Sequence, residues 1–247
     1  GNATWTGWPV RELLALARPR AGADMVLSRS SDGFTAGTPI EALTDDRNAL
    51  IAVGMNGEPL PFEHGFPVRL VVPGLYGYVS ATKWLVDLEV TKFEDFSAYW
   101  TERGWAEKAP MKLTSRIDVP ADGATVGIGP TRFGGVAWSP GVGIEAVEVQ
   151  LDGGAWEQAI LGNVEGIDTW VQWSIAATLD AGDHVVLVRA RDKSGATQTA
   201  VVRDVVPDGA TGWHKVEFTA ERSEPVKRQI GTSAGVKTFS SWQLRIR

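Results

Sequence analysis

Hydrophobic and polar residues follow two different patterns along this chain, and the change comes near residue 113. In the first part, apolar residues at positions 10, 13, 14 and 17 have the spacing of one face of a short helix. Pro9 suits the first turn of that helix, and Pro19 stops it. The spacing therefore predicts a short amphipathic helix that follows Pro9.

Two further helices are predicted in the first part of the chain. Thr38 and Glu41 have the form of a capping box, which predicts a short helix that runs to about Asp45. A third helix is predicted within residues 93–103. Strand-like runs separate and follow these helices, at residues 25–28, 50–55, 68–72 and 84–90. The first 112 residues therefore predict a mixed α+β region.

From about Leu113 the apolar residues alternate with period two, in short runs separated by turn signals. In Ile144–Leu151 the alternation fails only at the start, where Glu145 falls on the apolar face. Asp152-Gly153-Gly154 is a good hairpin turn, because glycine accepts a positive φ. Seven or eight such strands predict an immunoglobulin-like sandwich, from the runs 115–119, 125–127, 132–138, 144–151, 155–160, 170–176, 184–191 and 197–205.

Composition agrees with two ordinary globular domains. The chain has 247 residues, of which 43% are hydrophobic and 22% are charged. It has no cysteine, which excludes disulfides, cysteine-ligated metal sites and thiol catalysis within this chain. No apolar run approaches the roughly 18 residues that a membrane-spanning helix needs.

Charge argues against one class of partner. The formal net charge is −6, which is the wrong sign for a general nucleic-acid surface. The charge is uneven, because residues 221–247 are basic and the segments 1–112 and 113–220 are acidic. We interpret the basic segment as a solvated tail.

The usual catalytic motifs are absent from the sequence. There is no Walker phosphate loop, no dinucleotide fingerprint, no His-Glu-x-x-His and no Gly-x-Ser-x-Gly. His64, His184 and His214 are too dispersed for a metal site, and we interpret the last two as structural.

One segment has the side chains of an anion-binding loop. His64, Arg69 and Lys83 are three donors of charge-assisted hydrogen bonds, and glycine and proline residues lie between them. Small residues before Lys83 would let backbone N–H groups approach an anion. The alternative is structural, with His64 at a turn and the two cations paired with Glu63 or Asp87. Spacing alone leaves both interpretations open.

A series of motifs in this region resembles the molybdopterin domain of the sulfite oxidase family. The most specific run is Asn56-Gly57-Glu58-Pro59-Leu60-Pro61, then His64-Gly65-Phe66-Pro67-Val68-Arg69, then Lys83-Trp84-Leu85. The segments 2–7 and 31–34 match the same family. Segments 135–139, 147–156 and 210–218 resemble that family's C-terminal immunoglobulin-like dimerisation domain.

The resemblance implies a fold class and domain boundaries. The fold is expected to be α+β and mainly β, with a partial sulfite-oxidase-type molybdopterin domain followed by an immunoglobulin-like β-sandwich. The first domain is expected over 1–112, as the C-terminal part of the molybdopterin domain. The sandwich is expected over 113–220, and 221–247 is a basic tail of unknown role.

The resemblance also implies a cofactor and the residues that bind it. The family holds molybdenum on one pyranopterin. His64 and Arg69 take the roles of the residues at its phosphate end, and Lys83 with Ala81 and Thr82 also contacts it. Asp32 is the candidate for a pterin contact. No residue of this chain is expected to bind the metal directly.

The chain departs from the family at three places. The family's cysteine ligand stands shortly before the segment that matches Asn2-Ala3-Thr4-Trp5, so it is expected to lie upstream of Gly1. Trp105 stands at the position of a family Tyr near the metal, and Ser174 at that of a sulfite-binding Arg. Trp105 is alternatively a packing aromatic and Ser174 a solvent-facing strand residue. Tyr78, Tyr99 or Arg103 could compensate.

The sequence therefore predicts part of a molybdopterin-dependent oxidoreductase whose parent protein carries out two-electron oxygen-atom transfer on sulfite or a similar small oxyanion or sulfur substrate. The isolated chain is expected to be inactive, with its cofactor absent or incomplete. Expected partners are a second copy through the sandwich, the missing half of the molybdopterin domain and an unknown electron acceptor, but no nucleic acid. The alternative is a non-catalytic dimerisation or binding module, or a degenerate homologue without cofactor. A reductase of sulfoxide-type substrates is a further alternative within the enzyme class, which the presence of residues 113–218 disfavours.

Overall fold

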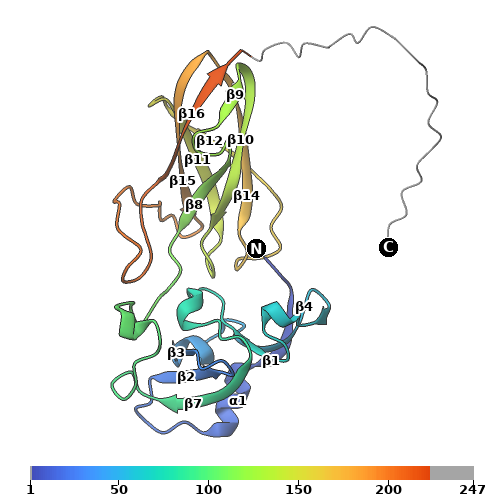
Figure 1. Cartoon of the computed structure of the whole chain (residues 1–247), viewed down its shortest axis with the longest axis vertical. Helices are drawn as coiled ribbons and strands as arrows, with labels where there is room; N and C mark the ends of the chain where they lie inside the picture. Colours follow the sequence, from blue (N-terminus) through green and yellow to red (C-terminus); the bar gives the residue numbers. More distant parts are fainter. Residues whose placement is uncertain (1, 223–247) are drawn as a thin grey trace, which may run out of the picture.

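The computed structural model describes residues 2–222, and these form two β-rich regions along the long axis of the molecule (Figure 1). The mainly β class with a sandwich in the second half is confirmed. The prediction of a basic tail over 221–247 lies, beyond Arg222, outside the described residues. Within the described residues, no helix is long and apolar enough to cross a membrane.

The N-terminal region consists of two small sheets with short helices around them. One sheet has the order β1-β4-β5 with β6 also on β4, and the other has the order β3-β2-β7. The strands are β1 (Trp5–Pro9), β2 (Met25–Ser30), β3 (Thr35–Pro39), β4 (Leu50–Met55), β5 (Glu58–Pro59), β6 (Arg69–Val71) and β7 (Leu85–Thr91). The helices are α1 (Val10–Ala17), α2 (Glu41–Thr44) and the 3₁₀ turns η1 (Phe62–His64), η2 (Gly77–Val79) and η3 (Thr101–Arg103).

The helix predicted after Pro9 is confirmed as α1. Val10 and Leu14 are buried, whereas Leu13 is more than one-third exposed. The buried face is therefore narrower than the apolar spacing suggested. Val10 and Leu14 join Val26, Leu43 and Leu70 in one hydrophobic core, so α1 is held by packing as well as by its own hydrogen bonds.

The capping box predicted at Thr38 is wrong. Thr38 lies in β3, where its buried hydroxyl donates to the carbonyl of Val79. The N-cap of α2 is Ile40, and the helix extends only from Glu41 to Thr44. A long-range hydrogen bond in the core has taken the hydroxyl that the local motif assigned to the helix.

The helix predicted over residues 93–103 is also wrong, because only the turn η3 forms there. The amide of Phe93 donates to Asp24 Oδ1, at 2.9 Å, and the amide of Tyr99 donates to Thr35 Oγ1, at 3.0 Å. The bond at Tyr99 replaces the i→i−4 bond that its amide would make in a helix, whereas Phe93, at the first position, would have no partner within the helix.

The C-terminal region is an immunoglobulin-like sandwich of two antiparallel-rich sheets, of order β13-β14-β10-β8 and β12-β11-β15-β16-β9. Residues from both sheets, among them Phe133, Val147 and Phe218, form its core. Its strands are β8 (Thr114–Val119), β9 (Thr125–Gly127), β10 (Gly129–Trp138), β11 (Ile144–Leu151), β12 (Trp156–Gln158), β13 (Ile160–Leu161), β14 (Val171–Leu179), β15 (Gly182–Asp192) and β16 (His214–Glu221).

Irregularities in the sandwich explain where the sequence pattern failed. The register of β11 against β15 shifts between Ile144 and Ala146, so the alternation changes phase there. Asp152 and Gly153 both have positive φ, which confirms the predicted hairpin turn between β11 and β12. The strand predicted over 197–205 is wrong, because only isolated bridges form there and Val202 is 82% exposed.

That segment belongs to a long connection, residues 193–213, between β15 and β16. Figure 1 shows it reaching from the sandwich toward the N-terminal region. The carbonyl of Pro207 accepts hydrogen bonds from the amide of Ala106, at 2.8 Å, and from the hydroxyl of Tyr78, at 3.3 Å. Lys112 Nζ donates to Asp208 Oδ1 at 2.8 Å and to the carbonyl of Gly209 at 2.6 Å. The connection therefore fastens the two regions together.

Candidate functional site

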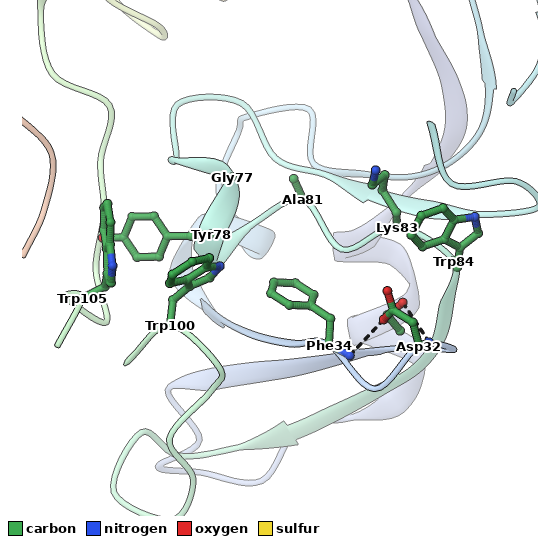
Figure 2. A pocket seen from close by; sticks show the side chains of 10 residues that line it. Asp32, Phe34, Gly77, Tyr78, Ala81, Lys83, Trp84, Trp100 and Trp105 are labelled. Atoms are coloured by element: carbon green, nitrogen blue, oxygen red, sulfur yellow. Dashed lines mark hydrogen bonds between the residues drawn. The ribbon is translucent and has the colours of Figure 1, made fainter. Parts of the chain in front are cut away.

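A pocket of about 380 Å³ opens in the N-terminal region (Figure 2). Its walls come from the turn between β2 and β3, from η2 and the segment after it, and from residues near η3. Figure 2 shows Asp32, Lys83 and Trp84 grouped on one side, and Tyr78, Trp100 and Trp105 on the other. The pocket therefore has a polar end and an aromatic end.

The predicted cations Arg69 and Lys83 lie against the loop that carries His64. The turn η1 ends at Gly65, whose φ is +106°, a conformation that favours glycine. A Cβ on Gly65 would lie 2.9 Å from Lys83 Cβ and 3.2 Å from Arg69 Cβ. The fold thus brings together the three residues that the sequence predicts as one site.

Arg69 is a partly buried cation that no carboxylate neutralises. Its Nη1 donates to the carbonyl of His64 at 3.1 Å, and its guanidinium lies 4.9 Å from the centre of the Trp5 ring. Burial lowers its pKa. Within residues 2–222, Arg69 forms no ion pair with any acidic side chain.

Lys83 also forms no ion pair within residues 2–222, although its charge contributes to the lowered pKa of Asp32. Its Nζ donates to the carbonyl of Glu63 at 3.0 Å and lies 4.7 Å from the centre of the Trp84 ring. Asp87, one of the alternative partners, instead pairs with Arg29. In the part of the chain that the structure describes, neither cation is paired with Glu63 or Asp87, so the structural alternative for these cations is wrong.

Trp84, next to Lys83, has an unusual backbone conformation and makes two hydrogen bonds that hold the Lys83 segment in place. Its φ is +48°, a left-handed conformation that costs a non-glycine residue roughly 1–2 kcal/mol. Its indole Nε1 donates to the carbonyl of Phe62 at 3.0 Å, and its own carbonyl accepts from the amide of Ser31 at 2.9 Å. These bonds tie the segment that carries Lys83 to both neighbouring loops.

Asp32 lies at the polar end of the pocket and is ionised. It accepts a hydrogen bond from the amide of Phe34 at 3.0 Å. That bond is the main reason why the pKa of Asp32 is lowered, with smaller contributions from Ser30 and the charge of Lys83. The polar end thus offers one carboxylate and one ammonium group.

Ala81 and Thr82 differ in what they present. Ala81 lines the pocket. Thr82 is buried, and its hydroxyl lies 2.6 Å from that of Ser28. The backbone of Thr82 accepts a bond from the amide of Leu70, at 2.9 Å. Its side chain therefore supports the loop from inside, while Ala81 leaves space at the pocket.

Trp105 and Ser174, two positions where the chain departs from the family, line different hollows. Trp105 lines the pocket, with its ring centre 4.7 Å from that of Tyr78. Ser174 lies in β14, paired with Gly134 of β10, and faces a separate hollow in the sandwich. Arg103 does not line the pocket either, because its guanidinium stacks on Tyr99 at 3.7 Å.

Sequence reasoning missed most of the aromatic lining. Phe34, Trp84 and Trp100 line the pocket, and Trp5 contacts Arg69. Aromatic residues at these positions have no motif of their own, and only the fold shows which of the 11 tryptophans meet. His184 and His214 lie in the sandwich and make hydrogen bonds within it: His184 bonds Asp152 and the carbonyl of Asp180, and His214 Nδ1 accepts from the amide of Ile117.

The donor set of the cationic loop fits a phosphate group. It consists of the guanidinium of Arg69, the ammonium of Lys83 and the imidazole of His64 on neighbouring segments. Of these residues, Lys83 also lines the pocket, which is large enough for a small organic cofactor. In residues 2–222 no group of three or more metal-binding side chains gathers anywhere. The fold and the site thus define a domain with a candidate cofactor pocket, joined to an immunoglobulin-like sandwich.

Comparison with known proteins identifies that class as the molybdopterin-binding oxidoreductases. Residues 1–100 match the family described as the oxidoreductase molybdopterin binding domain. The chain is 34% identical over 215 residues to mitochondrial sulfite oxidase of Homo sapiens, which covers 74% of this chain and 38% of that protein. It is 30% identical to the NADH nitrate reductase of Volvox carteri, over 80% of this chain and 28% of that protein.

A solved structure agrees with this class. The sulfane dehydrogenase SoxCD from Paracoccus pantotrophus matches with a TM-score of 0.70 and 25% identity, over 90% of this chain and 63% of that one. The chain belongs to the sulfite oxidase family of molybdopterin oxidoreductases. It spans 38–46% of the length of the mammalian sulfite oxidases that it matches.

Proposed function

We propose that this chain is part of a molybdopterin-dependent oxidoreductase whose parent protein carries out two-electron oxygen-atom transfer on a small sulfur or oxyanion substrate. Residues 1–112 form the C-terminal part of the cofactor domain in this proposal, and residues 113–220 form the sandwich. The observation that carries it is the pair Arg69 and Lys83, two cations without carboxylate partners in residues 2–222, which lie against one glycine-ended loop beside a pocket.

These residues have distinct roles in the proposal. His64, Arg69 and Lys83 bind the phosphate end of the pyranopterin, and Asp32 accepts hydrogen bonds from its polar ring edge. Ala81 leaves the space, and Thr82 fixes the backbone before Lys83. When bound, the molybdenum group supplies a metal that exchanges two electrons, which is chemistry that no side chain provides.

The chain has no cysteine, so it supplies no thiolate to the metal. We propose that the thiolate comes from a segment outside this chain, and that the chain alone is inactive. Trp105 stands where the family has a Tyr near the metal, and Ser174, in the sandwich, does not line the pocket. The pocket alone therefore does not supply the cationic side chains that sulfite would need.

A second candidate function is a dimerisation or binding module without chemistry. The complete sandwich favours it, because its core of buried residues from both sheets is independent of the pocket. We propose self-association through the sandwich in either case, so oligomeric state alone does not separate the two functions. Cofactor binding does separate the two functions, because only the oxidoreductase requires it.

The test is cofactor content. The 247-residue chain is produced in a host that makes molybdopterin, and released pterin and molybdenum are measured per chain. We expect pterin above background in the wild type and a loss of most of it in Arg69→Gln with Lys83→Gln. Molybdenum should remain well below one atom per chain. Arg116→Gln, an exposed arginine paired with Asp118 in the sandwich, is the matched control.

Two results would count against the proposal. Equal pterin in the wild type and the double variant would remove Arg69 and Lys83 from the cofactor site. One atom of molybdenum per chain would show that the chain needs no outside thiolate.

A further inference from the structure

The aromatic end of the pocket is built from rings that contact one another. Tyr78 and Trp105 lie 4.7 Å apart between ring centres, and Trp105 and Trp100 lie 5.9 Å apart. Phe34 lies between this group and the polar end (Figure 2). The rings are tilted or edge-on to their neighbours, as stable aromatic clusters are. A ligand at this end would therefore meet π-faces and ring edges.

The wall at this end is held from outside the pocket. The hydroxyl of Tyr78 donates to the carbonyl of Pro207, which also accepts a bond from the amide of Ala106, next to Trp105. Burial raises the pKa of Tyr78 to about 12, so this phenol stays neutral and keeps its proton for Pro207. The connection from the sandwich thus fixes Tyr78 and Trp105 relative to each other.

Formal charge in the pocket is confined to the polar end and sums to zero. Within residues 2–222, Lys83 and Asp32 are the only charged residues that line it, and the ammonium of Lys83 already contacts the carbonyl of Glu63 and the ring of Trp84. The faces of aromatic rings carry partial negative charge, so they attract neutral or positive groups and repel anions. A dianion would lose its hydration here, and few positive groups or hydrogen-bond donors would offset that free-energy cost.

We propose that the aromatic end of this pocket binds an uncharged organic molecule that carries an aromatic ring, and that Trp105 determines this specificity. The inference rests on the proposed function in one respect: the cofactor takes the polar end, and the aromatic end is left for substrate. Of the two substrate classes in the proposed function, this inference favours an uncharged sulfur compound over a small oxyanion. A cationic ring compound would be attracted by the ring faces, but it would give up its hydration at an end where no carboxylate is among the described lining residues, since Asp32 lies at the polar end.

The test separates the contribution of the aromatic ring to binding from that of the ligand's charge. Calorimetric titration of the 247-residue chain uses three probes with the same ring, namely methyl phenyl sulfoxide, benzenesulfonate and phenyltrimethylammonium, together with sulfite. We expect the neutral sulfoxide to bind about tenfold more tightly than each of the other three. Trp105→Leu should weaken sulfoxide binding about tenfold, and Trp105→Phe should restore most of it.

Trp8→Leu is the matched control, because Trp8 is 56% exposed on β1 and does not line the pocket. It should leave binding unchanged. Each variant is checked by thermal unfolding, and if Trp105→Leu fails to fold, Trp100→Phe is titrated and should weaken binding severalfold. Tightest binding of sulfite, of benzenesulfonate or of the cation would each overturn the proposal, as would equal sulfoxide binding by the wild type and the folded Trp105 or Trp100 variants.

The same variants distinguish this inference from the proposed function. Trp105→Leu should not change pterin content, because Trp105 lies at the far end of the pocket from Lys83 (Figure 2). Loss of pterin binding in Arg69→Gln with normal sulfoxide binding supports both proposals. Sulfoxide binding without any pterin in the wild type would contradict the proposed function alone.

Discussion

At the scale of single residues, Gly65 determines how closely the loop that carries His64 packs against Lys83 and Arg69. Its φ of +106° strains any other residue, and its missing side chain lets Lys83 and Arg69 approach. Gly57 offers a comparison, because its φ is +83° but nothing lies within 4 Å of the position that a Cβ would take. Both glycines therefore need a positive φ, but only Gly65 lies so close to other residues that a side chain would overlap them.

We expect Gly65→Ala to lower the free energy of unfolding by about 1–3 kcal/mol more than Gly57→Ala does, because only the former adds overpacking to the backbone strain. Gly65→Ala should also displace Lys83. Urea denaturation of both variants measures the difference. Equal losses of stability in the two variants would show that the Gly65 contact is soft.

His184 gives the sandwich a pH-dependent contact. Its Nε2 lies 3.0 Å from the carbonyl of Asp180 and its Nδ1 lies 2.7 Å from Asp152 Oδ2. These bonds, the one to Asp180 first, raise the pKa of His184 above its ordinary value of 6.5. Because the folded pKa is raised, the stabilisation is fully present below the unfolded pKa and is lost as pH rises through the folded pKa.

We therefore expect the stability difference between the wild type and His184→Gln to be largest below about pH 6.5 and to shrink at higher pH. Urea unfolding at a series of pH values measures it, and an NMR titration of His184 locates the midpoint. A difference that grows with pH would contradict the assignment of the raised pKa.

At the scale of elements, the connection between β15 and β16 fastens the sandwich to the wall of the pocket. Lys112 bonds Asp208 and the carbonyl of Gly209, and Pro207 receives the amide of Ala106. Lys112 is only partly exposed, so its bonds are less screened than those of a surface pair. This contact joins the sandwich to the segment that carries Trp105.

We expect Lys112→Ala to loosen this connection and to lower the hydrogen-exchange protection of the Ala106 amide severalfold. Lys108→Ala is the control, because Lys108 pairs with Glu41 across an exposed surface. Hydrogen exchange read by NMR distinguishes them. Unchanged protection at Ala106 in Lys112→Ala would show that Pro207 is held by other contacts.

Sequence patterns predicted elements well where the alternation was regular. Val147 and Val149 are buried on one face of β11, as their spacing indicated, and the irregular start of that strand is a bulge. The predictions failed where distant groups took a backbone bond or a cap. The hydroxyl of Thr35 accepts from the amide of Tyr99, and the backbone carbonyl of Val79 accepts from the hydroxyl of Thr38. Local sequence carries no information on such partners.

At the scale of the whole molecule, the two regions have separate cores. The sandwich core contains Phe133, which is 1% exposed, whereas the N-terminal core surrounds residues such as Val26 and Leu70. No residue belongs to both cores in the described chain. The regions meet instead through contacts outside both cores, among them the polar contacts near Pro207 and the two hydrogen bonds between Asn2 and Trp170.

We expect Phe133→Ala to destabilise the sandwich by about 3–5 kcal/mol, because it leaves a large cavity in a closed core. Hydrogen exchange in β10 and β14 should accelerate strongly, while β2 and β7 in the N-terminal region should change much less. Equal acceleration in both regions would show that they unfold as one cooperative unit.

The candidate site shows which of its residues can be predicted from the sequence and which depend on the tertiary fold. His64, Arg69 and Lys83 were predicted as one anion site from side-chain chemistry and a family resemblance, and the fold places them against one loop. Among the aromatic lining residues the sequence singles out only Tyr78 and Trp105. Phe34, Trp84 and Trp100 are not predicted, because they come from segments up to 66 residues apart, without a shared motif. Only tertiary packing brings them together.

The most direct test of the cationic site is pyrophosphate binding by the 247-residue chain, measured by calorimetry at constant ionic strength. We expect saturable binding that is lost in Arg69→Gln and in Lys83→Gln and retained in Arg116→Gln. Binding that is absent from the wild type, or unchanged in the first two variants, would contradict the assignment of Arg69 and Lys83 as the phosphate-binding pair.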